Sequence, residues 1–198
     1  MDITDPVTRI REDRSQARRQ DDPNANICFL ALADTTGEAS VRTLVLRDIT
    51  DNRFLLFVNR SSPKWRILMA GGSYQLLLWY SSMQRQYRVS GDVRVLDPEV
   101  VKHNWQRRPL GSKVLDLYYE NVGDQSTYVE SRAGFIAELG RIKQSYQPES
   151  IPVPEKAAGL ELIATHIEML DLNRDDRIHD RRMFAYEAGA WTQQTMVP

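Results

Sequence analysis

ASVRTLVLR (residues 39–47) and RFLLFVNR (residues 53–60) are the two segments that decide the fold. Strict alternation in the first segment places Arg42, Leu44 and Leu46 on one face, which is typical of a half-buried antiparallel strand. The opposite face carries Val41, Thr43, Val45 and Arg47. Two such strands in succession, joined by a short connection, predict an antiparallel meander and argue against a parallel nucleotide-binding sheet.

The residues after the second strand, Ser61-Ser62-Pro63-Lys64, have the composition of a helix start. Ser62 is a suitable N-cap, and Pro63 is a suitable first helical residue. Free backbone N–H groups beside a cation such as Lys64 favour an anion, most simply a phosphate. Many ordinary helices begin with Ser-Pro, so these residues alone leave a phosphate site and plain surface structure both open.

Length and composition narrow the class of protein. The chain has 198 residues, of which 41% are hydrophobic, so it can form one substantial core. Its net charge is −1 with basic and acidic residues interspersed, and we therefore expect no nucleic-acid partner. No hydrophobic run approaches the roughly 20 residues that span a bilayer, so we expect a cytoplasmic protein without a membrane partner. The single cysteine, Cys28, lies in an apolar segment and is expected to be a buried packing residue.

The order of the remaining segments predicts a small antiparallel barrel with flanking helices, an α+β protein that is mainly β. Residues 1–21 are highly charged and are interpreted as an N-terminal arm, either mobile or a surface helix, and residues 22–198 as a single domain. The arm is also a candidate contact with a partner subunit. Further strands are expected at 27–34, 74–80 and 84–96, the last with a bend or bulge at Gly91. Five strands by residue 96 favour a closed or split barrel over an open sheet.

Helices and a final hairpin are expected in the second half of the chain. Asp97-Pro98 predicts a helix that ends before Pro109, and a second helix is expected over 112–119. An amphipathic helix is expected within 134–146. The apolar run at 160–170 suits a helix or a strand by its periodicity, and residues 181–194 predict a hairpin turning near Gly189.

The opening stretch resembles the flavin mononucleotide (FMN) site of the pyridoxamine 5′-phosphate oxidase family. In that family an Arg-x-Val-Leu-Leu-Lys strand precedes a Phe/Tyr-Thr-Asn strand end and a Ser-Arg-Lys helix start. The corresponding segments here are residues 42–47, 57–59 and 62–64. The resemblance implies an antiparallel FMN-binding split β-barrel and a strand at 160–170. It also implies a homodimer, because the family builds its flavin sites from both subunits.

Four further segments resemble the same family in the same order. They are Arg85-Gln86-Tyr87-Arg88-Val89-Ser90-Gly91, Arg108-Pro109-Leu110-Gly111-Ser112, Gln125-Ser126 and Arg177-Ile178-His179-Asp180-Arg181. The amide of Gln86 both donates and accepts, which suits the edge of an isoalloxazine ring. The guanidinium fork of Arg108 and the hydroxyl of Ser112 suit a phosphate monoester. Taken singly, each segment also fits a solvated strand or an exposed charged turn.

The resemblance implies a division of roles among the site residues. The cofactor-binding residues would be Arg42, Thr43, Leu44, Val45, Arg47, Phe57, Val58, Ser62, Lys64, Gln86, Gln125, Ser126 and Arg181. The substrate phosphate would be held by Arg47, Arg108 and Ser112. Arg177 and His179 would bind the substrate ring and act as the catalytic residues. No metal site is expected.

The activity implied by the resemblance is that of an oxidase of vitamin B6 metabolism acting on pyridoxine or pyridoxamine 5′-phosphate. Hydride would pass from the substrate C4′ carbon to flavin N5, and dioxygen would reoxidise the flavin, giving pyridoxal 5′-phosphate and hydrogen peroxide. In such a reaction the cofactor performs the redox step, while the protein supplies positioning and charge.

Four positions depart from the family pattern and leave two alternatives open. Pro63 stands in place of a cation, Val58 in place of a threonine, Asn104 in place of a tyrosine and Leu170 in place of a tryptophan. One alternative is a related FMN-dependent oxidoreductase that acts on a different small heterocycle. The other is a flavin-binding or pyridoxal-phosphate-binding protein without turnover.

Overall fold

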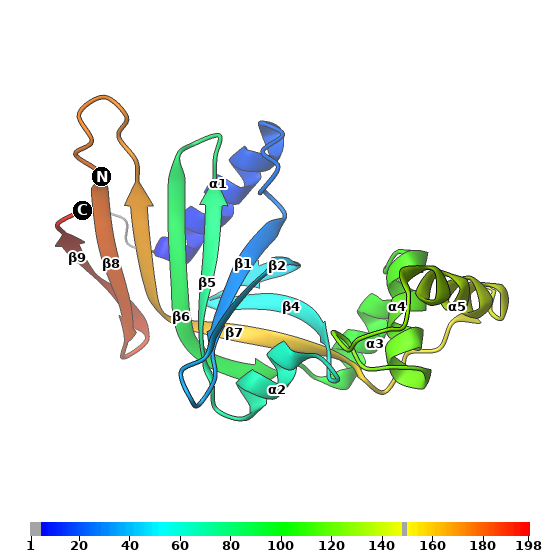
Figure 1. The fold of residues 1–198 in the computed structure, drawn as a ribbon. Helices are drawn as coiled ribbons and strands as arrows, with labels where there is room; N and C mark the ends of the chain where they lie inside the picture. The colour runs from blue at the N-terminus through cyan, green and yellow to red at the C-terminus, as the bar shows by residue number, and fades with distance from the viewer. Residues whose placement is uncertain (1–4, 148–149) are drawn as a thin grey trace.

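The structure is a computed structural model, and it describes residues 5–147 and 150–198. Its strands are β1 (Ile27–Ala33), β2 (Ala39–Val45), β3 (Asp48–Thr50), β4 (Arg53–Asn59), β5 (Ser73–Tyr80), β6 (Arg85–Val95), β7 (Ala157–Asp171), β8 (Asp180–Glu187) and β9 (Ala190–Met196). Its helices are α1 (Pro6–Arg19), α2 (Pro63–Met69), α3 (Pro98–Trp105), α4 (Leu110–Asn121) and α5 (Arg132–Gln144). Together they form an antiparallel sheet, curled into a half-barrel, with helices at its flanks (Figure 1).

Strand β7 is the longest strand and pairs with three others, β4, β6 and β8. The strand order is β2-β1-β5-β6-β7-β4-β3, and β8 and β9 extend the sheet from β7. The first half of β7 pairs with β4, so that Ala157 lies opposite Asn59. Its last residues pair with β8, so that Asp171 lies opposite Asp180. Since 15 extended residues span up to about 45 Å, the two ends of β7 hold distant parts of the molecule.

The curl of the sheet depends on a bulge in β6 at Gly91. The register between β6 and β7 shifts between Ser90 and Gly91. Gly91 has a φ of +154°, and a Cβ atom at this position would lie 2.1 Å from the carbonyl oxygen of Ile163. The expected bend is therefore confirmed, and only glycine fits it without displacing the neighbouring strand.

The main core fills the inside of the half-barrel. Alternation along β1, β4 and β5 sends every second side chain inward, including Leu30, Phe54 and Leu76, none of which is exposed. Burial of one such side chain contributes about 1.5–3 kcal/mol. Cys28 is also fully buried, and burial raises the pKa of its thiol to about 12, so the expected packing role fits.

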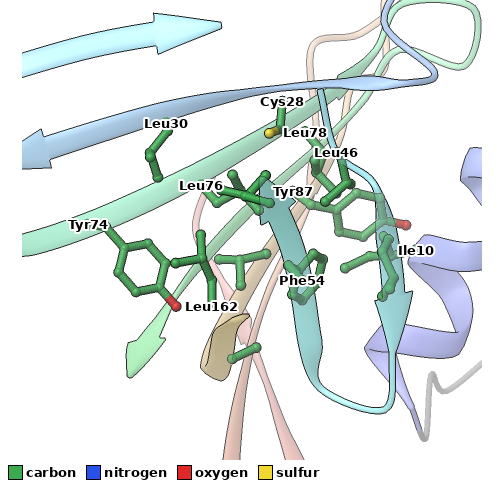
Figure 2. Packing of buried hydrophobic residues seen from close by; sticks show 14 of the residues in the cluster. Ile10, Cys28, Leu30, Leu46, Phe54, Tyr74, Leu76, Leu78, Tyr87 and Leu162 are labelled. Atoms are coloured by element: carbon green, nitrogen blue, oxygen red, sulfur yellow. The ribbon is translucent and has the colours of Figure 1, made fainter. Parts of the chain in front are cut away.

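The N-terminal segment forms helix α1, the second of the two interpretations offered above for residues 1–21. Val7, Ile10 and Ala17 are buried in the main core of the same chain. Figure 2 shows Ile10 among the buried side chains of the barrel, which include Phe54 and Tyr87. The helix thus packs on its own barrel. Residues 1–4 lie outside the described part of the chain.

Helices α3, α4 and α5 form a separate lobe beside the end of the sheet where β4 meets the start of β7 (Figure 1). A second hydrophobic cluster holds this lobe and includes Leu96, Trp105 and Leu117. Helix α5 was expected to be amphipathic, but none of its residues, all of which are described, is buried, and Ile136 is 47% exposed. No helix within 5–147 and 150–198 is long and apolar enough to cross a membrane.

Most element predictions are confirmed, including a strand at the ambiguous run 160–170 and the hairpin at Gly189. One strand was missed. The connection at 48–52 was expected to be irregular, but Asp48–Thr50 pairs with β4 as the short strand β3, so six strands precede residue 96. The hairpin turns at Asp51, whose φ is +52°.

Candidate functional site

A cleft lies where β2, β4, α2 and α4 meet. One of its cavities measures about 160 Å³ and is lined by Leu44, Phe57, Val58, Asn59, Lys64, Arg108, Ser112, Leu115, Asp116, Tyr119 and Gln125. A second measures about 280 Å³ and is lined by Arg42, Thr43, Leu44, Pro63, Lys64, Gln125 and Ser126. The two cavities share three lining residues, and we call them together the cation cleft.

Lys64 is placed in the cation cleft by the start of helix α2. Ser62 caps the helix by accepting a hydrogen bond from the backbone N–H of Trp65 at 3.3 Å, as the sequence predicted. Lys64 is only 6% exposed, and its Nζ donates to Oε1 of Gln125 at 3.0 Å. Burial and the nearby charge of Arg42 lower the pKa of Lys64 from 10.5 to about 8, while Asp116 opposes them. The cleft therefore holds a buried cation whose charge is incompletely balanced.

Arg108 approaches the same cleft from the segment between α3 and α4. Its guanidinium lies 5.3 Å from the ring centroid of Trp105, and its Nη2 lies 2.7 Å from Oδ2 of Asp116. Burial and the charge of Arg47 lower the pKa of Arg108, while Asp116 opposes this. The Nε of Arg108 is buried and has no hydrogen-bond partner among the residues that the structure describes. One donor of the fork is thus available to a ligand.

Three polar residues that the sequence analysis did not select connect these cations. The amide of Asn59 donates to Oδ1 of Asp116 at 3.2 Å and accepts from the hydroxyl of Ser61 at 2.7 Å. Ser61 accepts in turn from the backbone N–H of Gln125 at 3.0 Å. Burial raises the pKa of Asp116, and Arg108, Asn59 and Lys64 oppose it. A signal was available, because residues 112, 116 and 119 are spaced to share one face of a helix.

The other predicted residues of this region take different positions. Arg42 points inward from β2 and donates to Ser40 Oγ, and its pKa is lowered by partial burial. The exposed Arg47 has its guanidinium 5.8 Å from the ring centroid of Phe57. Val45 is 47% exposed on the opposite face of β2 and does not line the cleft. Ser126 lines the cleft with a φ of +72°.

Gln86, Arg177, His179 and Arg181 lie at the other end of β7, and the chain does not bring them to the cation cleft (Figure 1). Gln86 and Arg181 both lie opposite Leu170, on β6 and β8 respectively. Arg177 and His179 belong to the loop 172–179 that follows β7. In this loop His179 Nδ1 accepts from the backbone N–H of Asn173 at 3.1 Å. The predicted site is therefore divided into two groups within one chain.

The departures from the family pattern can also be located. Asn104 donates its amide to the carbonyl of Val100 at 2.9 Å within α3 and does not line the cation cleft. Pro63 occupies the first position of α2 and lines the cleft without offering a donor. Leu170 lies between Gln86 and Arg181 on the sheet.

The curled antiparallel sheet with flanking helices is a split barrel of the FMN-binding type, which confirms the expected fold. The sequence matches the family model described as pyridoxamine 5′-phosphate oxidase over residues 16–146, and the chain therefore belongs to this family. The expected family is confirmed.

Curated relatives and solved structures agree with this assignment. The pyridoxine/pyridoxamine 5′-phosphate oxidase of Thermosynechococcus vestitus is 28% identical over 194 residues, which cover 98% of this chain and 89% of the relative. That of Synechocystis sp. is 30% identical over 176 residues, covering 89% and 80%.

Two solved structures share the fold. PhzG from Burkholderia lata 383, in complex with tetrahydrophenazine-1-carboxylic acid, has a TM-score of 0.87 at 19% identity and covers 99% of this chain and 94% of that one. A pyridoxamine 5′-phosphate oxidase-related, FMN binding protein from Nostoc punctiforme has a TM-score of 0.75 at 16% identity, with complete coverage of both chains.

Proposed function

We propose that this chain is an FMN-dependent oxidase of pyridoxine or pyridoxamine 5′-phosphate that forms pyridoxal 5′-phosphate. The observation that carries the proposal is a pair of cations in one cleft: Lys64, which is buried, and Arg108, which forms an ion pair with Asp116. Two cations at separate positions suit two different phosphate groups, one on the cofactor and one on the substrate. The names of the curated relatives support the same activity.

The charge balance of the cleft fits the phosphate of FMN. Arg42, Lys64 and Arg108 line it, and Asp116 is the one carboxylate among the described lining residues. Burial, and after it the charge of Arg42, lower the pKa of Lys64. A phosphate dianion would offset the surplus of positive charge in the cleft. We assign Arg42 and Lys64 to the cofactor phosphate, and the apolar walls formed by Leu44, Phe57 and Val58 to the ring system. When bound, FMN would supply the acceptor for the substrate hydride.

The substrate phosphate is assigned to Arg108, Ser112 and Arg47. The available Nε of Arg108 and the position of Ser112 in the cavity wall support this assignment. The ion pair of Arg108 with Asp116 fixes the direction of the guanidinium fork, so that an anion meets a preformed donor. Asp116 is thereby a positioning residue for Arg108, the cation assigned to the substrate phosphate.

The predicted site residues at the other end of β7 are proposed to reach the cleft from a second copy of the chain. Within one chain the length of β7 separates this group from Lys64 and Arg108. Arg177 has a φ of +60°, a conformation that costs a non-glycine residue about 1–3 kcal/mol and often occurs at functional sites. The outer face of β2 exposes Val41 and Val45, at 69% and 47%, which suits a covered surface. Arg177 and His179 would then orient the substrate ring.

A second candidate is oxidation of a different and larger heterocycle. A cavity of about 690 Å³ between α4 and α5 adjoins the cation cleft at Ser112 and Leu115, which line both. In addition, Asn104 offers no hydroxyl where the family has a tyrosine, and its amide is bound to its own helix. A substrate with an anionic group at Arg108 and a larger apolar part would use both features.

The proposal is tested by the visible spectrum of the purified protein. We expect it to take up FMN in a titration and to lose the absorption of oxidised flavin when pyridoxine 5′-phosphate is added without oxygen. Admission of oxygen should restore the absorption and release hydrogen peroxide. Failure to take up FMN would contradict the proposal. Retention of FMN without reduction by either B6 phosphate would leave the second candidate or a binding protein without turnover.

A further inference from the structure

Strands β6, β7 and β8 carry a connected polar group on the face of the sheet that points away from the core. Arg88 lies directly opposite Glu168 across β6 and β7, and Gln86 lies opposite Leu170, which lies opposite Arg181 on β8. Residues opposite one another in an antiparallel sheet share a face, as do alternate residues along a strand. We call Gln86, Arg88, Glu168 and Arg181 the outer-face cluster.

Glu168 is the centre of the outer-face cluster. It is only 8% exposed, although it lies on the outer face. Its Oε1 lies 3.0 Å from Nε of Arg181 and 3.3 Å from Nη1 of Arg88. A carboxylate that is this deeply buried requires such partners, because an unpaired buried charge costs several kcal/mol. The two arginine side chains are thus held by one carboxylate.

The cluster extends from Arg88 to Gln86. With its amide oxygen turned toward Arg88, Gln86 accepts hydrogen bonds from Nε at 3.0 Å and Nη2 at 3.3 Å. This orientation commits the oxygen to Arg88 and leaves the N–H groups of the Gln86 amide as donors. Gln86 therefore presents a hydrogen-bond donor, not an acceptor, to a ligand at this face.

We infer that Glu168 is the positioning residue that fixes Gln86 and Arg181 for the cofactor. The inference rests on the proposed function and on the FMN-binding role that the family resemblance implies for both residues. It goes further by naming the group that orients them. Without the carboxylate, Arg88 and Arg181 would lose their common partner and repel each other, and the amide of Gln86 would lose its fixed direction. Glu168 itself acts only through these neighbours.

Glu168→Gln tests the inference, and Glu161→Gln is its matched control. Glu161 lies on the same strand, forms an ion pair with Arg94 and lies 4.0 Å from Arg53, and among the described residues no ion pair joins it to an assigned cofactor residue. FMN affinity, the spectrum of bound flavin and the melting temperature are measured for both variants of the full chain. We expect Glu168→Gln to weaken FMN about tenfold or more and to shift the flavin bands, because charge-assisted bonds are lost. Glu161→Gln should change neither the FMN affinity nor the flavin bands.

A second variant, Arg88→Met, tests the link to Gln86 separately from the ion pair with Arg181. It also replaces Glu168→Gln if that variant does not fold. Arg88→Met removes the link to Gln86 but leaves the ion pair of Glu168 with Arg181. The side chain of Arg88 is 40% exposed, so the change is tolerated by the fold. We expect it to shift the flavin bands, with a smaller loss of affinity than Glu168→Gln.

Two results would overturn the inference: wild-type FMN affinity and spectrum in both Glu168→Gln and Arg88→Met, or equal losses in Glu168→Gln and Glu161→Gln. Failure of the proposed function gives a different result, since the wild-type chain would then take up no FMN. In that case crystal structures of the flavin-free variants decide the inference. The side chains of Gln86 and Arg181 must move in Glu168→Gln and stay in place in Glu161→Gln.

Discussion

The two ends of β7 differ in how their predicted ligand-binding residues are held. At the first end, Lys64 and Asp116 are buried, and Arg108, whose side chain is 16% exposed, forms an ion pair with Asp116. Hydrogen bonds also join Asp116 to Asn59 of β4 and Lys64 to Gln125. At the second end, Arg177 is exposed and His179 is half-buried, and both belong to a loop. A single chain therefore groups its polar residues in a cleft at one end of β7 and places Arg177 and His179 on a loop at the other.

The loop 172–179 is nevertheless anchored where it leaves β7. The backbone N–H of Leu172 donates to the carbonyl of Gln84 at 3.0 Å, and Nε of Arg174 donates to the Gln84 side chain at 3.1 Å. Arg85 binds both Asp171 and Asp13 of α1. The base of the loop is thus fixed to the barrel while its tip is free to meet another surface. If the proposed function holds, we expect the cleft to bind a ligand first and the loop to complete the site.

The largest expected effect is at the cleft end. Lys64→Met should weaken FMN about a hundredfold, because a buried charge-assisted contact with the phosphate is lost. The same change should raise the melting temperature of the flavin-free protein, since burial of the Lys64 charge is unfavourable and lowers its pKa. Fluorescence titration and thermal unfolding measure the two effects. Lower stability together with unchanged FMN binding would show that Lys64 has a structural role.

The division between the two ends leads to a complementation experiment. Lys64→Met disables the cleft, and His179→Ala disables the loop, so each variant alone should have little oxidase activity. If each site takes its cleft from one chain and its loop from the other, a mixed dimer holds one intact site. Complete exchange of equal amounts should then restore about a quarter of the wild-type activity. The mixture is assayed after unfolding and joint refolding, and the separately refolded variants serve as controls. Activity no higher than in those controls would argue against sites shared between chains.

The third prediction concerns the pH dependence of the cleft end. In the flavin-free protein the pKa of Lys64 is about 8, below its ordinary 10.5. A bound phosphate favours the protonated amine, so FMN affinity should be constant below pH 8 and fall by up to about tenfold per pH unit above it. The stability of the flavin-free protein should change in the opposite direction. Between pH 8 and 10.5 the unfolded chain binds more protons at Lys64, so the contribution of this residue to stability rises with pH.

Lys64→Arg is the control for this pH dependence. Arginine keeps its charge across the whole range, so the variant should bind FMN with little change between pH 7 and pH 9. Titrations at several pH values on both proteins compare the slopes. A parallel decline in the two proteins would assign the pH dependence to another group.

Much of the fold could be predicted from local sequence patterns. Alternation in β2, the Ser-Pro start of α2 and the glycine at the bulge each specify one structure. The burial of α1 could not be predicted in the same way. Asp13 and Arg14 look like solvent-exposed residues in the sequence, yet both are buried, because Asp13 binds Arg85 and Arg14 donates to the carbonyl of Ala25. Partners so far along the chain leave no local signal.

The candidate site could likewise be predicted only where its residues lie in local motifs. The motif residues of the cleft, such as Lys64 and Arg108, could be selected from the sequence because they lie in recognisable segments. Asn59 and Asp116 were missed, since their function depends on a contact between β4 and α4. Which residues separate into the two groups could not be derived from the residues themselves, because it follows from the length and pairing of β7. The family resemblance implied only that flavin sites are built from both subunits.

The smallest expected effect concerns Asn104, which lies on α3 and does not line the cleft. Asn104→Tyr would replace an amide bound to Val100 by a phenol four residues before Arg108, which follows the end of α3. If the substrate is a B6 phosphate, the added hydroxyl should improve kcat/KM about fivefold, or about 1 kcal/mol, the value of one hydrogen bond. Asn104→Phe is the control, since it adds the ring without the hydroxyl and should give no such gain. An equal gain in both variants would assign the effect to packing. A loss of activity in both would indicate that the wild-type pocket accommodates a substrate bulkier than a B6 phosphate, as the cavity between α4 and α5 suggests.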